Sequence, residues 1–211
     1  MANIQVNSNY YLNHKYASLE RFISYFHQID AIHESKAQSI LFIGVGDAMV
    51  TNFLKKELRV VTMDIDPDLN PDKVGDIRSL PFPDGSFDTV CAFEVLEHIP
   101  LNEAGTALHE MCRVSSSTVL ISVPHRRSGF EFVFKFPFIR SLLKRNYVRL
   151  ALLFPVKFPG FVVSKQHYWE IDGWTLRLRH FRNILKANFH IISEKTPVLD
   201  PYRRFFYLER K

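Results

Sequence analysis

Two glycines and one aspartate have the residue types and spacing that a nucleoside-binding site requires. Gly44 and Gly46 follow the β-branched run 39–43, and Asp64 ends the next such run, 20 positions after Gly44. Glycines let the backbone turn tightly out of a strand and approach a ligand closely. A carboxylate at the end of the neighbouring strand can accept both hydroxyls of a ribose. Because a dinucleotide fingerprint would need a third glycine where Met49 stands, the pattern predicts a nucleoside without a pyrophosphate.

A second group of side chains could carry acid–base chemistry. The segment 93–98 contains Glu94, Glu97 and His98, which lie on one face if a helix begins there. The segment 167–172, which begins with His167, follows a long insertion, and we expect it to return to the same end of the predicted site. His125 follows a predicted strand and is an alternative base.

Hydrophobic periodicity predicts the elements that position these residues. Short β-branched runs alternate with longer stretches. These stretches are too long for hairpin turns and have helical periodicity, as the crossover connections of a parallel sheet do. We therefore predict an α/β, Rossmann-like, doubly wound, mostly parallel seven-stranded sheet. Expected strands are 39–43, 59–64, 73–75, 87–93, 118–123, 189–194 and 203–209, the last two forming an antiparallel edge hairpin, and expected helices are 16–33, 47–57, 101–113 and 172–187.

The chain is expected to form a single domain over residues 1–211, with two added parts. Residues 1–36 are predicted to be an N-terminal helical cap, in which Tyr10, Tyr11 and His14 could face the site or pack in the core. Residues 128–166 are predicted to be a basic aromatic lid insertion. Phenylalanines alternate over 130–138, and apolar residues then recur at three- and four-residue steps, which predicts an amphipathic helix.

The positive charge of the chain is concentrated in that insertion. The whole protein has a net charge of +5, and nine Lys or Arg but one acid, Glu131, lie between Arg126 and Lys165. Such a segment can cover a substrate cleft, lie on a membrane surface or bind a nucleic acid. The polar N-terminus, the absence of a long apolar run and the two isolated cysteines lead us to expect a cytoplasmic protein, peripheral at the membrane if the insertion binds lipid.

The segment 75–88, GDIRSLPFPDGSFD, resembles the D-x-x-x-L-P-F-x-D-x-S-F-D segment of class I S-adenosylmethionine-dependent methyltransferases, of the type called methyltransferase domain type 11. The resemblance implies S-adenosylmethionine as cofactor. It implies that Asp64 holds the ribose, that Asp76 accepts from the adenine amine, and that Phe93 lines the methionine side. The implied cofactor-binding residues are Gly44, Gly46, Asp64, Ile65, Asp76, Ile77 and Phe93. Phe42 and Ala48 depart from the pattern, because the family often has an acid and a glycine there.

Part of the sequence also resembles two groups of metal-dependent O-methyltransferases. One group acts in ubiquinone biosynthesis and has an E-x-x-E-H motif, and the other methylates the 2′-oxygen of small RNAs and has a later H-x-x-E-W type segment. This resemblance implies a divalent metal ion bound by Glu94, Glu97, His98 and His167. The candidate catalytic residues are His98, His125 and His167, and Tyr168 and Trp169 could stack on an acceptor or be buried.

These patterns predict a methyltransferase that acts on an oxygen of a small molecule or glycan. Two alternatives stay open: an RNA or a lipid-linked acceptor, and a non-catalytic module that keeps the nucleoside pocket. The sequence does not identify the acceptor or the oligomeric state.

Overall fold

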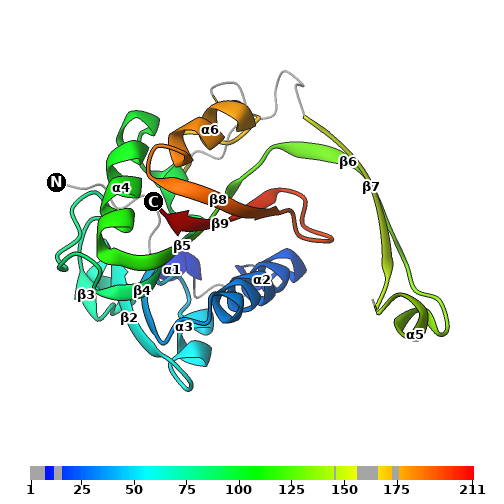
Figure 1. The fold of residues 1–211 in the computed structure, drawn as a ribbon, viewed down its shortest axis with the longest axis horizontal. Coiled ribbons are helices and arrows are strands. Elements are labelled where there is room, and N and C mark those ends of the chain that lie inside the picture. Colours follow the sequence, from blue (N-terminus) through cyan, green and yellow to red (C-terminus); the bar gives the residue numbers. More distant parts are fainter. Residues whose placement is uncertain (1–7, 12–15, 145, 156–165, 173–175) are drawn as a thin grey trace.

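The computed structural model describes residues 8–11, 16–144, 146–155, 166–172 and 176–211. Its centre is a seven-stranded sheet with the strand order β3-β2-β1-β4-β5-β9-β8 (Figure 1). The strands are β1 (Ser39–Ile43), β2 (Arg59–Asp64), β3 (Lys73–Val74), β4 (Phe87–Phe93), β5 (Ser115–Pro124), β8 (Phe189–Lys195) and β9 (Arg203–Arg210). The first five are parallel, whereas β9 runs antiparallel to both β5 and β8. The predicted fold class is therefore confirmed, including the antiparallel pair at the edge.

Helices cover both faces of this sheet (Figure 1). They are α1 (Ser8–Tyr11), α2 (Leu19–Ser35), α3 (Met49–Leu54), α4 (Leu101–Val114) and α6 (Leu178–Leu185). Strand β1 explains why both faces need cover. Its residues alternate between two buried clusters, with Leu41 and Ile43 packed among residues of α4 and α6, and Ile40 and Phe42 packed among residues of α2 and α3. Strands buried on both faces read as continuous apolar runs, which is why periodicity identified them.

Parallel pairing brings three strand ends to one edge of the sheet. Ile43 is paired with Met63 of β2 on one side and with Ala92 of β4 on the other. The Gly44 N–H continues the β1–β2 ladder by donating to the Met63 carbonyl (2.9 Å). The loops after β1, β2 and β4 therefore begin at the same level, as in other open α/β sheets where ligands bind outside the carboxyl ends of the strands.

The insertion differs from its prediction. Strands β6 (Arg127–Phe134) and β7 (Val148–Pro155) form a separate two-stranded antiparallel sheet, and α5 (Ile139–Leu143) at its tip is the one helix among the described residues of the insertion (Figure 1). The expected helical run after position 137 is wrong for β7. Its apolar residues Val148, Leu150 and Leu152 also alternate with period two, and pairing with β6 selects the strand.

Two further local predictions need correction. The segment after β4 does not begin a helix, because Glu94 has a positive φ of 56° and only a short 3₁₀ turn, Leu96–His98, precedes α4. Helix α6 is shorter than the predicted 172–187, and residues 173–175 lie outside the described part of the chain. Among the described residues, no helix is both long and apolar enough to cross a membrane.

Ala48 occupies a backbone conformation that favours glycine, since its φ is 59° and its ψ is 8° at the start of α3. A left-handed conformation costs a residue with a Cβ atom roughly 1–2 kcal/mol. We expect Ala48→Gly to raise the free energy of unfolding by about 1 kcal/mol in urea denaturation. The control Ala187→Gly changes an exposed alanine that is not among the positive-φ residues and should lower it. A less stable Ala48→Gly variant would contradict this account.

Candidate functional site

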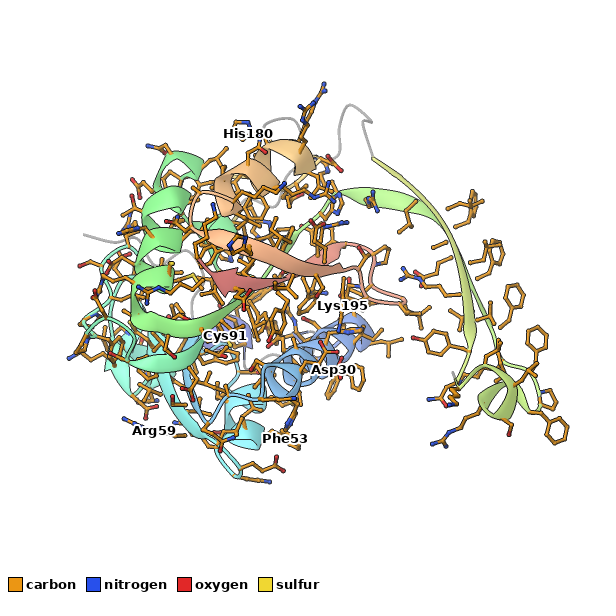
Figure 2. All side chains as sticks on the ribbon, in the orientation of Figure 1. Asp30, Phe53, Arg59, Cys91, His180 and Lys195 are labelled. Atoms are coloured by element: carbon orange, nitrogen blue, oxygen red, sulfur yellow. The ribbon has the colours of Figure 1, made fainter. Side chains whose placement is uncertain are left out.

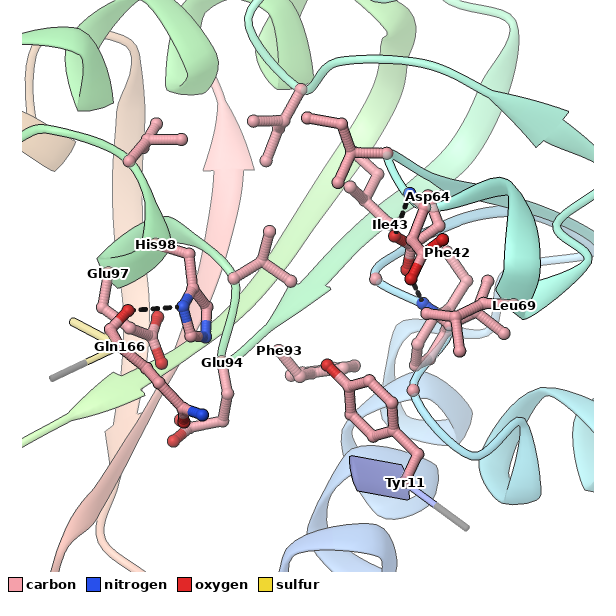
Figure 3. A pocket seen from close by; sticks show the side chains of 18 of the residues that line it. Tyr11, Phe42, Ile43, Asp64, Leu69, Phe93, Glu94, Glu97, His98 and Gln166 are labelled. Atoms are coloured by element: carbon pink, nitrogen blue, oxygen red, sulfur yellow. Dashed lines mark hydrogen bonds between the residues drawn. The ribbon is translucent and has the colours of Figure 1, made fainter. Parts of the chain in front are cut away.

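A cavity of about 560 Å³ opens where the carboxyl ends of β1, β2 and β4 meet. Figure 3 shows two groups of side chains on opposite sides of it, Asp64 and Leu69 on one and Glu97, His98 and Gln166 on the other, with Tyr11 and Phe93 between them. The predicted site residues that line the cavity are Gly44, Gly46, Asp64, Ile65, Asp76, Ile77, Phe93, Glu94, Glu97, His98 and His167. The structure thus brings both predicted groups to one cavity.

The glycine turn after β1 forms one wall of this cavity. Gly44 has a φ of 87°, and a Cβ atom built on it would lie 2.5 Å from the Val95 side chain, so only glycine fits. Gly46 has a φ of 57° and lies against Tyr11 and Tyr16. The turn therefore presents its backbone to the cavity.

The Asp64 carboxylate joins two loops. Its Oδ2 accepts from the Val45 N–H (2.7 Å), and its Oδ1 accepts from the Asp66 N–H (3.0 Å). Burial raises the pKa of Asp64, while these backbone donors lower it and leave a smaller upward shift. Each carboxylate oxygen has a second lone pair, so the group can still accept from a pair of ligand hydroxyls.

Apolar side chains continue from Asp64 along the cavity. Ile65 and Leu69 follow β2, and Ile77 is buried beside them in the cavity wall. The Arg78 guanidinium hydrogen-bonds both oxygens of Asp76 and lowers the pKa of that carboxyl. A slot with apolar walls and a fixed acid at its rim suits a flat heterocycle that carries an amine.

The opposite end of the cavity is built from Glu97, His98 and His167. One potential ligand atom from each of these residues lies within 4.8 Å of the others. The rings of His98 and His167 meet edge to face with their centroids 5.1 Å apart. Glu94 does not belong to this converging group, and its carboxylate accepts from the Ser122 hydroxyl (2.8 Å) instead.

His98 is held as a neutral base. Its Nδ1 lies 2.8 Å from the Gln166 carbonyl oxygen (Figure 3), which can only accept, so the hydrogen is on Nδ1 and the lone pair is on Nε2. Burial and the neighbouring His167 lower the pKa of His98 to about 4. The ring is therefore unprotonated at neutral pH.

Glu97 is an acid that lies entirely in the protein interior. It is 0% exposed, and no described residue donates a hydrogen bond to either carboxylate oxygen. Burial, and then the charge of Glu94, raise the pKa of Glu97 well above its ordinary value of 4.5. Burial also raises the pKa of Glu94, although Arg203 and Ser122 act in the opposite direction. In the absence of a ligand, Glu97 favours its protonated form.

His167 is oriented by a carboxylate. Its Nδ1 lies 2.9 Å from Glu170 Oε1, which also accepts from the Tyr202 hydroxyl (2.7 Å). Burial raises the pKa of Glu170, but these two hydrogen bonds outweigh it, and the net shift is downward. An ionised Glu170 fixes the His167 hydrogen on Nδ1 and leaves Nε2 as the acceptor nitrogen.

Other candidates do not reach the cavity. His125 is buried, its Nε2 is 2.6 Å from Asp172 Oδ2, and it is not among the lining residues. Trp169 is also buried, and its indole N–H donates to the Ile99 carbonyl (3.0 Å), so it packs in the core. Tyr168, in contrast, is exposed and lines the cavity.

Sequence reasoning missed several lining residues. Arg21 lies over the Tyr16 ring, 4.2 Å from its centroid, and both line the cavity beside the glycine turn. Tyr202 immediately precedes β9 and Arg203 begins it, more than 100 residues after β4. No local pattern in the sequence marks such residues. Tyr10 and Tyr11 line the cavity, which agrees with the first of the two alternatives given for them, that they face the site. His14 lies outside the described residues.

Comparison with a protein-family model adds evidence that is independent of this geometry. Residues 41–121, which run from β1 into β5, match the family described as methyltransferase domain. This segment is similar to a methyltransferase domain. The match contains the glycine turn, Asp64, Asp76 and the Glu97–His98 segment, so most of the cavity belongs to it. No curated protein matches the chain.

Solved structures share the fold of this chain. The N-methyltransferase NodS from Bradyrhizobium japonicum WM9, in complex with S-adenosyl-L-homocysteine, has 11% identity and a TM-score of 0.59, over 92% of this chain and 89% of that one. Magnesium protoporphyrin IX methyltransferase from Synechocystis PCC 6803, with bound S-adenosylhomocysteine, has 16% identity and a TM-score of 0.56, over 91% and 83%. At these identities the likeness shows the fold alone.

We expect Glu97→Gln to change how stability depends on pH. Because the folded-state pKa of Glu97 is raised above 4.5, the unfolded chain releases this proton first as the pH rises, and wild-type stability falls by at most about 1.4 kcal/mol per pH unit from this group. Glutamine removes that loss. Urea denaturation between about pH 5 and 8 should show the variant gaining on the wild type as the pH rises.

The control Glu57→Gln changes an exposed residue and should track the wild type. Parallel pH profiles for Glu97→Gln and the wild type would contradict the assignment of a buried protonated acid.

Proposed function

We propose that this protein is an S-adenosylmethionine-dependent methyltransferase that methylates an oxygen of a small molecule or glycan. The observation that carries the proposal is the placement of two chemically different ends in one cavity. Asp64 and an apolar slot lie at one end, and the unprotonated His98 lies at the other. A nucleoside donor and an acceptor with a hydroxyl need such an arrangement.

Small acceptors are favoured by the size of the cavity and by the structural relatives. About 560 Å³ is within the range of roughly 300–1,000 Å³ of small-molecule sites. One relative with this fold, a Burkholderia thailandensis N1-methyltransferase, has 1,6-didemethyltoxoflavin and S-adenosylhomocysteine bound, at 12% identity and a TM-score of 0.55. It supports a heterocyclic or other small acceptor without identifying it.

The residues of this chain have distinct tasks in the proposed reaction. When bound, the sulfonium donor supplies a methyl group that is already activated for direct displacement. Asp64 holds the ribose, Ile65 and Ile77 contact the adenine, and Gly44 and Gly46 let the methionine end approach the backbone. His98 Nε2 takes the proton of the acceptor hydroxyl, and Gln166 fixes the ring for this role. The main catalytic effect is alignment, which in favourable cases supplies roughly 7–11 kcal/mol of the barrier reduction.

We expect Asp64→Ala to weaken S-adenosylhomocysteine binding at least about tenfold, because hydrogen bonds to a charged group contribute about 1.5–3 kcal/mol each. Isothermal titration calorimetry measures the effect. Asp68→Ala, a neighbouring exposed aspartate that does not line the cavity, is the matched control. Equal affinities for the wild type and Asp64→Ala would remove the ribose assignment.

We expect His98→Gln to lower kcat by about 100-fold or more, the usual effect of losing a general base, with little change in KM. Because the lowered pKa of His98 is about 4, the wild-type kcat/KM should stay level above that pH and fall below it. The exposed His190→Gln serves as control. Full activity of His98→Gln would show that another group takes the proton.

A divalent metal ion is a second candidate for activating the hydroxyl. One oxygen of the Glu97 carboxyl and one ring nitrogen each of His98 and His167 lie within 4.8 Å of one another, and such a mixed oxygen and nitrogen set suits a transition metal. A bound ion would lower the pKa of an acceptor hydroxyl. Glu94 lies outside this group and is expected to act on Arg203 instead, which is 3.5 Å away.

Titration with manganese or zinc chloride tests the metal candidate. We expect binding to the wild type and to Glu57→Gln, and no binding to Glu97→Gln. Absence of binding to the wild type, or full activity in excess chelator, would rule the metal out and leave His98 as the base.

A further inference from the structure

One face of the β6–β7 hairpin is apolar and exposed along its length. In an antiparallel pair, residues directly opposite each other share a face. Phe130, Phe132 and Phe134 of β6 are opposite Leu152, Leu150 and Val148 of β7. These six side chains are between 38% and 64% exposed. Monomeric proteins rarely leave so many neighbouring apolar side chains in water unless they contact a partner.

The apolar face continues onto the tip of the hairpin. The rings of Phe132, Phe134 and Phe136 are nearly parallel, with centroid distances of 6.3 and 6.1 Å. Phe138 and Leu142, at the start and within α5, are 85% and 83% exposed. The tip therefore has the most exposed apolar side chains of the hairpin.

The opposite face fixes the hairpin against the domain. The Arg149 guanidinium donates to the carbonyls of Thr196 (3.0 Å) and Pro197 (3.1 Å) in the β8–β9 loop. Glu131 Oε1 accepts from the Leu199 N–H (2.9 Å) and lies 2.8 Å from Arg149 Nε. As a consequence, the apolar face points away from the domain, where aromatic rings stand along the outer side of the hairpin (Figure 2). No described residue of the hairpin lines the cavity, so the apolar face of the hairpin does not cover the cavity.

The charges around the apolar face are positive. Lys135, Arg140 and Lys144 are exposed near the tip. Glu131 is the one acid between positions 126 and 165, and it is engaged by Arg149. Two copies joined through this face would bring like charges together, whereas an anionic surface would neutralise them.

We propose that the β6–β7 hairpin docks the protein on the surface of an anionic phospholipid bilayer. The phenylalanine and leucine side chains enter the interfacial region, and Lys135, Arg140 and Lys144 contact the phosphates. This inference does not depend on the proposed methyl transfer, because the docking face and the cavity share no described residue.

Flotation with lipid vesicles tests the docking, with no cofactor present. The probes are vesicles of phosphatidylcholine alone and of phosphatidylcholine mixed equally with phosphatidylglycerol. We expect the wild type to float with the mixed vesicles and to bind phosphatidylcholine at least about tenfold more weakly. The variant Phe130→Ser/Phe132→Ser/Phe134→Ser should bind the mixed vesicles at least about tenfold more weakly than the wild type, since its changed residues are exposed.

Two double variants that each remove two positive charges distinguish an effect of charge at the hairpin tip from an effect of the overall charge. Arg140→Gln/Lys144→Gln should weaken binding to the mixed vesicles at least about tenfold, whereas Lys56→Gln/Arg179→Gln, exposed residues elsewhere, should bind like the wild type. Absence of wild-type binding, or equal loss in both pairs, would overturn the proposal. A wild-type dimer in sedimentation that the triple serine variant abolishes, without vesicle binding, would show instead that the face joins two copies.

Discussion

The hydrogen bonds of the Asp64 carboxylate are the interaction on which the site depends. One oxygen holds the backbone of Val45, inside the glycine turn, and the other holds Asp66, so the loops after β1 and β2 are fixed to each other. Parallel pairing of the two strands brings these loops to the same level, and the carboxylate then sets their separation. Because the same oxygens keep unused lone pairs, the group that organises the loops can also bind a ligand.

The other end of the cavity shows a different use of burial. Glu97 and His98 both favour their neutral forms, although one is an acid and the other is a base. Desolvation is the largest cause of both shifts, since it penalises whichever form carries charge. His98 is thereby kept unprotonated, and Glu97 in its protonated form can donate a hydrogen bond or give up its proton to bind a cation. Burying Glu97 destabilises the fold, because no described residue donates a hydrogen bond to its carboxyl oxygens.

The sequence predicted the parts of this molecule that local patterns encode. Strands β1 and β2 are short apolar runs bounded by glycine or charge, and Asp64 ends β2 at a recognisable distance from Gly44. The helical start expected at Glu94 is wrong, because that residue has a positive φ and its carboxylate contacts Ser122 and Arg203, which lie far away in the sequence. Strand β7 was predicted as part of a helix because its apolar residues satisfy both periods, and only the partner strand decides between them.

The remaining site residues could not be predicted because they come from distant parts of the chain. Tyr202 and Arg203 reach the cavity only because β9 lies between β5 and β8. Arg21 reaches it because α2 packs beneath the glycine turn, where Tyr25 donates to Asp47 (2.6 Å). Conversely, His125 follows a strand of the same sheet, as a base at the cavity would, but its side chain pairs with Asp172 outside the cavity.

The structure of the complex with S-adenosylhomocysteine tests the central claim most directly, that one cavity holds the donor at Asp64 and the acceptor at His98. The account predicts ribose hydroxyls on the Asp64 carboxylate, adenine between Ile65 and Ile77, and the sulfur facing Glu97, His98 and His167. A nucleoside bound elsewhere, or a sulfur that faces away from His98, would contradict it.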